Sequence, residues 1–435
     1  SAESWNALAL CCFNLARRES FPVVDDEYRL VTDATLAAAT HALPAQPGSV
    51  GADGPDVSWS EPAPRLHAAK ALLFIALRSP HSAEEVVIQV TALAADHVPA
   101  VRFLVAHHLT CLANSAAEAM WSVLEEFGIN ETNAAVLQTV VGQPLARLLA
   151  LDADRVGRLV EKIAKRTGEE PLLERVAESC GTVIAAGHVL YEDAFCRDLV
   201  YQITANAVSS PQALGLVGLQ REWLSSHLVG GSQEDLAQRV RALNLMNHVT
   251  VAACEQWRRA LTTQHAPSEQ ADETEKSVKR LVALLRAVTS SIFFASGAFK
   301  EKEASSNGRI LTIEEKAQFL KDTGHAIDLL AEAGVPGITH ELIETLVCLV
   351  PADPRTVFLH VARLVQAGRA GGYQYESMAV KLVVGVVERY LAEFRHVFSS
   401  DAECRAALVS VLDIFVSAGW PEAQRLTYRL DEIFR

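Results

Sequence analysis

Apolar residues recur three and four positions apart along almost the whole chain, and the alternation typical of β-strands is never sustained. The clearest case is residues 377–398, SMAVKLVVGVVERYLAEFRHVF, where charged residues occupy the face opposite the apolar one. The pattern predicts one amphipathic helix of about six turns. Its expected buried face consists of Met378, Ala379, Leu382, Val383, Val386, Val387, Tyr390, Leu391, Phe394, Val397 and Phe398.

Two further helices are expected after this one. Asp401 is a suitable N-cap for the first, Gly419 ends it, and Pro421 opens the second. Three helices joined by short turns would then close the C-terminus, as a repeat array needs a capping unit at its end.

Extended over the chain, the same analysis predicts an all-α protein of about twenty helices joined by short turns. Polar or Pro/Gly-rich stretches interrupt the pattern at residues 42–64, at 263–275 and, less markedly, at 300–309. We therefore expect N-terminal helices over 1–41, a loop or linker over 42–64, helical repeats over 65–262, a polar linker over 263–275, and further repeats with capping helices over 276–435.

A repeated pattern lies within the second of these blocks. In DHVPAVRFLVAHHL an aspartate, Asp96, is followed three positions later by Pro99, and Val101 begins a run of helix-spaced apolar residues. Leu66 and Val136 occupy the position of Val101 in neighbouring segments, and both spacings are 35 residues. A period in the tens of residues is typical of helical-repeat proteins.

This stretch resembles a HEAT repeat, of the HEAT/armadillo-like class, with the best match over residues 61–187. The resemblance implies an α-solenoid of stacked antiparallel helix pairs. It also implies that Asp96 and Arg102 form ladders between neighbouring repeats, so both are expected to be structural. Asp96 and Asn130 are expected at the starts of the second helices of their pairs, where Asp and Asn are good caps.

Composition narrows the class of protein. Half of the 435 residues are hydrophobic, only 6% are aromatic, and the net charge is −14, which opposes non-specific binding to nucleic acid. The eight cysteines form no CxxC pair, and no apolar run reaches membrane-spanning length, so we expect a cytoplasmic protein. The excess of arginine over lysine, 29 against 10, suggests a GC-rich bacterial genome. Because the chain begins Ser1-Ala2 without methionine, we expect it to be part of a larger, multidomain protein.

His107, His108 and Cys111 are the first candidates for chemistry. Residues four apart share a helix face, so His107 and Cys111 could contact one zinc ion. Zinc needs further ligands, and the sequence has no HxH, CxxC or HExxH partner pair. We therefore interpret His108 as a residue of the helix seam and His107 as solvent-facing, and expect neither a metal nor a cofactor.

The best candidate for binding is the segment DRVGRLVEKIAKRTG. It places five basic residues within an arc of about 100° on one helix, as a ridge about 16 Å long. This basic ridge consists of Arg155, Arg158, Lys162, Lys165 and Arg166. The ridge could bind phosphates or an acidic partner segment, and the alternative interpretation is a solvated helix face.

Three functions remain open at this point. The leading hypothesis is a non-catalytic interaction module, a scaffold or sensor that binds a protein or peptide in its concave surface. The alternative is a HEAT-like nucleic-acid-binding protein, similar to HEAT-like DNA glycosylases, that uses the basic ridge. The third is an enzyme using His188, Tyr191, Glu192 and Asp193, although this stretch also fits a helix start. The chain has no P-loop, GxGxxG or GxSxG motif to support an enzyme.

Overall fold

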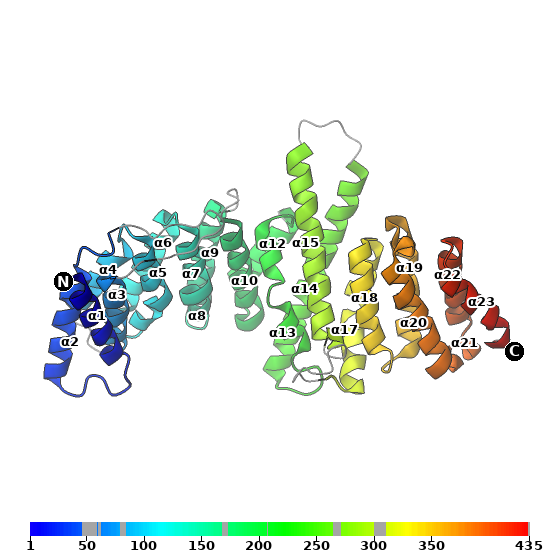
Figure 1. The fold of residues 1–435 in the computed structure, drawn as a ribbon, viewed down its shortest axis with the longest axis horizontal. Coiled ribbons are helices and arrows are strands. Elements are labelled where there is room, and N and C mark those ends of the chain that lie inside the picture. Colours follow the sequence, from blue (N-terminus) through cyan, green and yellow to red (C-terminus); the bar gives the residue numbers. More distant parts are fainter. Residues whose placement is uncertain are drawn as a thin grey trace. The chain divides into compact units, whose positions relative to one another are not determined.

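The computed structural model describes residues 1–45, 59, 62–78, 84–167, 173–206, 208–263, 271–299 and 310–433. All regular secondary structure in these ranges is helical, which confirms the all-α class (Figure 1). The chain divides into two compact units, Ser1–Leu199 and Val200–Arg435. Within the described ranges, no helix combines the length and the apolar character needed to cross a membrane.

The first unit is a series of helices of ordinary length. They are α1 (Ala2–Ala16), α2 (Asp25–Ala39), α3 (Pro64–Arg78), α4 (Glu84–Ala94), α5 (Pro99–His108), η1 (Leu109–Leu112), α6 (Ala117–Asn130), α7 (Ala134–Val140), η2 (Val141–Leu145), α8 (Ala146–Leu148), α9 (Ala153–Thr167), α10 (Glu174–Tyr191) and the start of α11 (Ala194–Asn206). The η2 segment is a π-helical turn around Pro144, which lacks the N–H that an α-helical turn would use there.

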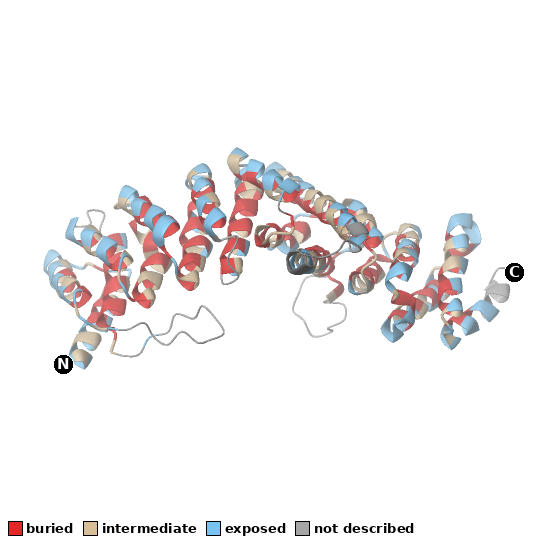
Figure 2. Ribbon diagram, turned by 90° about the horizontal axis from the view of Figure 1, so that it is seen from above, coloured by how far each residue is buried: buried red, intermediate tan, exposed pale blue. Residues whose placement is uncertain are grey.

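These helices pack in two rows. In one row α2 contacts α4, α4 contacts α6, and α6 contacts α9; in the other, α3 contacts α5, α5 contacts α7, and α7 contacts α10. The N-terminal α1 packs against α3. Leu66, Val101 and Val136, the positions of the 35-residue spacing, are at most 1% exposed and lie on α3, α5 and α7 of the second row. Buried residues gather on the faces that neighbouring helices turn toward one another (Figure 2). The spacing therefore marks equivalent core positions of successive helices.

Two expected caps are wrong. The N-cap of α5 is Val98, whose side chain cannot cap, and Asp96 instead accepts a hydrogen bond from the Val98 amide at 2.8 Å in the preceding turn. Asn130 is the last residue of α6, and Asn133 caps α7 by accepting from two backbone amides at 3.0 and 3.2 Å. An Asx side chain two residues before the N-cap can organise the turn that precedes a helix without itself capping the helix.

Arginine side chains connect helices of this unit that are far apart in the sequence. Arg65 at the start of α3 pairs with Asp96 in the α4–α5 turn at 3.1 Å. Arg102 of α5 makes a bidentate pair with Glu131 in the α6–α7 turn, at 2.7 and 2.9 Å. Arg166 at the end of α9 donates to the Glu131 carbonyl at 2.8 Å. We call these contacts the arginine ladder; Asp96 and Arg102 both take part in it, and the resemblance to a HEAT repeat stays a prediction.

The second unit contains longer helices. They are the end of α11, α12 (Pro211–Leu216), α13 (Gln220–Ser225), α14 (Gln233–Thr263), α15 (Ala271–Ala295), α17 (Ile313–Glu332), α18 (Pro336–Leu349), α19 (Pro354–Gly368), η4 (Arg369–Gly371), η5 (Tyr373–Tyr375), α20 (Ser377–Glu393), α21 (Arg395–Ser400), α22 (Ala402–Ser417) and α23 (Pro421–Ile433). Contacts again follow two rows, α14–α17–α19–α22 and α15–α18–α20–α23. Helices α14 and α15 form a hairpin that extends past their neighbours in this unit (Figure 1).

The C-terminal helices match the prediction with two corrections. Asp401 caps α22 by accepting from the Cys404 amide at 2.9 Å, Gly419 follows the helix at φ +89°, and Pro421 opens α23. The expected six-turn helix is instead two helices, because Phe394 leaves helical geometry at φ −126°, ψ 29°. Met378, assigned to the buried face, is 65% exposed in the first turn of α20.

The segments expected to separate the helical blocks are only partly described. Outside the described residues lie 46–58, 60, 61, 264–270 and 300–309. At the second break, α14 continues through Thr263 and α15 begins at Ala271, so residues 271–275 of the expected linker are helical. The expected blocks 1–41, 65–262 and 276–435 stay predictions.

Candidate functional site

The basic ridge lies on α9, as the sequence predicts, but acidic groups face most of it. The Arg155 guanidinium lies 3.2 Å from Glu125 of α6 and 4.5 Å from the Trp121 ring centroid. Arg158 makes a bidentate pair with Asp154, with both distances 2.8 Å.

The other three basic residues of the ridge differ from one another. Lys165 pairs with Glu161 at 2.7 Å. Arg166 donates to the Gly128 and Glu131 carbonyls at the end of α6, where a cation also complements the helix dipole. Within the described chain, Lys162 alone of the five residues has no ion pair or hydrogen bond of its side chain. The ridge is thus largely neutralised, and a binding role for it stays a prediction.

The histidine pair occupies the second row of the first unit. The His107 ring stacks on Phe103 at 6.2 Å between centroids, and it meets His108 edge-on at 4.7 Å. His108 in turn lies 5.6 Å from the Phe74 ring of α3. Among the described residues, no group of three or more His, Cys, Asp or Glu side chains is placed to hold a metal ion. The histidines are members of a ring cluster between α3 and α5.

This cluster continues onto α1 and carries cations. The Phe13 ring lies 5.7 Å from Phe74, and the Lys70 ammonium lies 4.9 Å from the Phe13 centroid. Arg17 approaches the same ring at 5.6 Å. We call this surface the aromatic–basic face. It consists of the rings of Phe13, Phe74, Phe103, His107 and His108 and the cations Arg17, Lys70, Arg78 and Arg147.

Its electrostatics are those of positive groups crowded in apolar surroundings. Burial, together with smaller contributions from His107, Lys70 and Arg147, lowers the pKa of His108 to about 4. Burial also lowers the pKa of His107, with Arg147 as the second cause, and lowers the pKa of Lys70. Both imidazoles are therefore neutral at pH 7.

Cys111, in η1 directly after α5, lies in the same apolar and positively charged surroundings. Burial raises the pKa of its thiol to about 11, while Arg147 and Arg78 act in the opposite direction. Among the residues that the structure describes, no carboxylate contributes to the pKa shifts of the histidines, Lys70 or Cys111.

Sequence reasoning missed this face although a signal for it exists. Lys70, Phe74 and Arg78 are spaced by four on α3, and Phe103 and His107 are spaced by four on α5. Spacing of four places side chains on one helix face. What the sequence does not reveal is that α1, α3, α5 and α8 bring these faces together.

The stretch proposed as an enzyme site forms the turn between α10 and α11. Tyr191 ends α10, and Glu192 adopts left-handed geometry at φ +54°. Asp193 accepts a hydrogen bond from the Cys196 amide at 2.7 Å, which satisfies one of the open N–H groups of the α11 terminus. Asp193 thus has the role of a helix start, but His188 and Tyr191 lie in the last turn of α10 and Glu192 is its C-cap, so the helix-start interpretation is wrong for these three residues.

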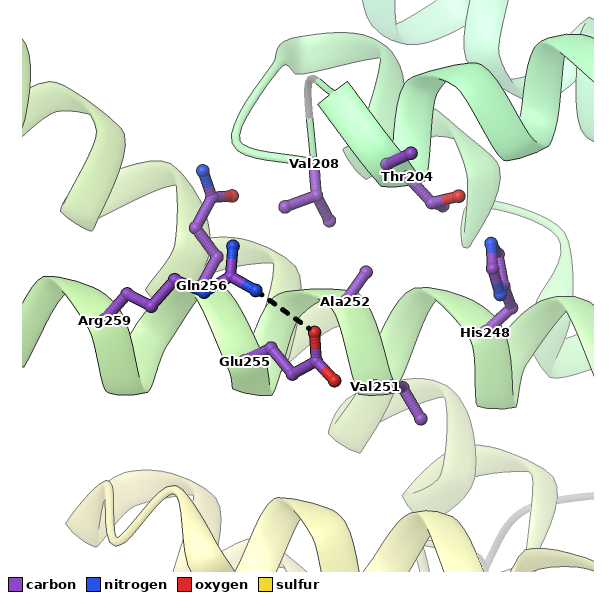
Figure 3. A pocket seen from close by; sticks show the side chains of 9 residues that line it. Thr204, Val208, His248, Val251, Ala252, Glu255, Gln256 and Arg259 are labelled. Atoms are coloured by element: carbon purple, nitrogen blue, oxygen red, sulfur yellow. Dashed lines mark ion pairs between the residues drawn. The ribbon is translucent and has the colours of Figure 1, made fainter.

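A cavity in the second unit lies between the end of α11 and the middle of α14 (Figure 3). It has a volume of about 220 Å³, and its polar lining includes Thr204, His248, Gln256 and the Glu255–Arg259 ion pair, whose N···O distance is 3.5 Å. Burial lowers the pKa of His248, whose ring meets Tyr201 edge-on at 4.8 Å. Small-molecule sites are commonly about 300–1,000 Å³. This cavity is smaller, and its one charge pair is internally balanced.

No protein-family model matches the chain, and no curated protein matches it at a significant level.

Proposed function

We propose that the chain is a non-catalytic helical-repeat interaction module, a HEAT-like α-solenoid that binds a protein or peptide on the surface of its stacked helices. In this proposal it serves as a scaffold or sensor within a larger bacterial protein. Stacked pairs expose a helix face from each repeat, so a repeat array presents an extended surface to a linear partner.

The arginine ladder is the observation that carries the proposal. Arg65 and Arg102 each link one helix pair to the turn of the following pair, at 3.1 and 2.7 Å respectively. Both side chains are at most 16% exposed. A contact that recurs between successive pairs is what a stack of similar units requires, because each unit buries its faces only against its neighbours.

A related but more exposed contact occurs in the second unit, where the Arg355 side chain is 50% exposed. Arg355 follows Pro354 at the start of α19, as Arg65 follows Pro64 at the start of α3. It pairs with Asp401 at 2.6 Å and with Glu403 at 2.7 Å, and Asp401 is also the cap of α22. The same Pro-Arg dipeptide thus joins one helix to the start of a later helix in each unit.

Nucleic-acid binding by the basic ridge is the alternative. It would require the ridge cations that pair with Glu125, Asp154 and Glu161 to break these ion pairs and contact phosphates instead. The net charge of −14 adds a long-range repulsion of polyanions. The observed pairing therefore supports the peptide-binding proposal over the nucleic-acid alternative.

Affinity selection tests the proposal. The folded full chain is immobilised and exposed to a display library of random peptides of about 12 residues, which span up to about 40 Å when extended. We expect enriched peptides that protect row-surface segments from hydrogen exchange. Absence of enrichment over the urea-unfolded chain contradicts the proposal, and retardation of DNA or RNA at low salt with micromolar protein would support the alternative.

A further inference from the structure

We propose that the aromatic–basic face of the first unit is a docking site for an acidic peptide segment, in which carboxylates flank an apolar side chain. The proposal rests on the proposed function and names the site and the chemistry of the partner. The occupant is a protein segment and not a nucleic acid.

The cations of this face lack acidic partners. Lys70 contacts the Phe13 ring. Arg147 donates a hydrogen bond to the Gln143 amide oxygen at 3.0 Å, and among the described residues it pairs with no carboxylate. Arg78 donates to the Arg17 carbonyl at 3.4 Å, and its buried Nε has no hydrogen-bond partner. In the described part of the chain, none of these four cations forms a salt bridge.

A partly desolvated cation without an anion is unfavourable for the free protein. Burial lowers the pKa of Lys70, which means that its surroundings disfavour the charged ammonium. A carboxylate placed beside it would remove this penalty, and charge-assisted hydrogen bonds are roughly twice as strong as neutral ones. Arg155, Arg158 and Lys165 of the α9 ridge offer less gain, because each of them already has a carboxylate partner.

The rings supply the apolar half of the site. Phe13, Phe74 and Phe103 are all half-buried, so each ring has one part in the core and one part toward solvent. Leu77, beside them on α3, is 43% exposed. An apolar side chain of the partner would cover these surfaces, which contribute about 25 cal/mol per Å² buried.

The spacing fits an extended segment. Lys70 and Arg78 are eight residues apart on one helix, hence about 12 Å at a rise of about 1.5 Å per residue. An extended peptide advances about 3.3 Å per residue. Two acidic residues about four positions apart could therefore reach the two cations, with the apolar residue between them over Phe74.

The histidines make the site sensitive to pH. His107 faces Phe103, His108 and Arg147, while His108 faces Phe74, His107, Lys70 and Arg147. A bound carboxylate would favour the imidazolium, so the pKa of each histidine would be higher in the complex than in the free chain. Protons are then taken up on binding, and affinity rises as the pH falls from the ordinary histidine value of 6.5 toward the pKa of about 4 of free His108.

The peptide selection described above tests this site through the composition of the enriched peptides. We expect enrichment of Asp and Glu around an apolar residue, and weaker binding as salt rises, since solvent-exposed charges are screened. The variant pair Lys70→Met and Arg147→Met removes two charges but keeps the aliphatic stems. We expect it to raise Kd about tenfold, which corresponds to about 1.4 kcal/mol.

Arg158→Met with Lys165→Met, on the α9 ridge, is the matched control and should leave Kd unchanged. Circular dichroism verifies that both double variants are folded. Enriched peptides that are neutral or basic, that protect another surface, or that bind the Lys70/Arg147 variant undiminished overturn this site and leave the proposed function standing. Failure to enrich any peptide overturns both.

Discussion

The arginine ladder makes a quantitative prediction about stability. The Glu131 side chain is only 2% exposed, and Arg102 meets it with two hydrogen bonds of 2.7 and 2.9 Å. Glu131 also accepts from the amides of Thr132 and Asn133 at 2.9 and 2.8 Å. Arg102→Met removes the cation and leaves the carboxylate buried in the turn between α6 and α7.

The loss of stability depends on the hydrogen bonds that the Glu131 carboxylate keeps in the variant. Removing one partner of a buried ion pair costs about 3–5 kcal/mol, and the two remaining amide donors favour the lower end. Arg102 also loses its 2.7 Å bond to the Asp96 carbonyl, a contribution of about 1 kcal/mol. We expect a loss of about 4 kcal/mol, and for a unit of this size about 8–16 °C in Tm.

Thermal unfolding followed by circular dichroism measures the loss, and hydrogen exchange over residues 96–140 locates it. Arg158→Met is the control, since its pair with Asp154 is 58% and 51% exposed and should contribute less than about 1 kcal/mol. Adding Glu131→Gln to Arg102→Met should recover part of the loss, because no uncompensated charge stays buried. If Arg102→Met loses no more than Arg158→Met, the ladder does not hold the helix pairs together.

Three other predictions test the packing of the first unit. Gly187→Ala should destabilise it by about 1–3 kcal/mol, because the new Cβ would lie 2.5 Å from the Cys196 sulfur, whereas Gly142→Ala meets nothing within 4 Å and should be tolerated; chemical denaturation compares the two. His108 has a pKa of about 4 in the folded chain against an ordinary 6.5, so below pH 6.5 the unfolded chain binds the extra proton. Stability should therefore fall between pH 6.5 and pH 4 by about 1–2 kcal/mol after allowance for solvent screening, and His108→Asn should flatten the urea-midpoint profile. Iodoacetamide should label exposed Cys11 in the native chain and reach Cys196, whose pKa is raised by burial, only on unfolding; equal labelling rates by mass spectrometry would contradict this packing.

Local chemistry explains where the sequence predicted the fold well. Asp401 and Pro421 mark helix starts because capping and the missing N–H of proline act within a few residues. Leu66, Val101 and Val136 could be assigned to the core because the same packing contact recurs at a fixed spacing. Such signals are contained in a short window of sequence.

The predictions from sequence failed where tertiary contacts determine the end of a helix or the role of a residue. The apolar pattern continues through Phe394, so periodicity alone gave no reason for a helix to end there, yet α20 ends one residue earlier. Asp96 has the sequence of a cap, but Arg65 from another helix pair holds its carboxylate. In both cases the sequence identified the right element and misplaced its boundary or the role of a residue.

The basic ridge shows the same limit, because the sequence does not reveal every acidic group that lies beside its cations. The basic ridge was chosen because five cations share a face of α9, and that count is correct. Two acids on the same helix, Asp154 and Glu161, lie four residues from Arg158 and Lys165 and were available to the sequence. Glu125 was not, because it reaches Arg155 from α6.

Availability of a cation depends on its partners in space and not on the number of cations nearby. Lys70 and Arg147 are 77 residues apart in the sequence, and neither belongs to a charge run. Yet both act on His108, and no carboxylate contributes to the shift of that histidine. A dense basic run on a helix attracts its own acids at i+4 and from the next helix, whereas isolated cations set among rings keep their charge for a ligand. Peptide binding should therefore depend on the dispersed cations of α3 and α8 and be indifferent to the concentrated ones of α9.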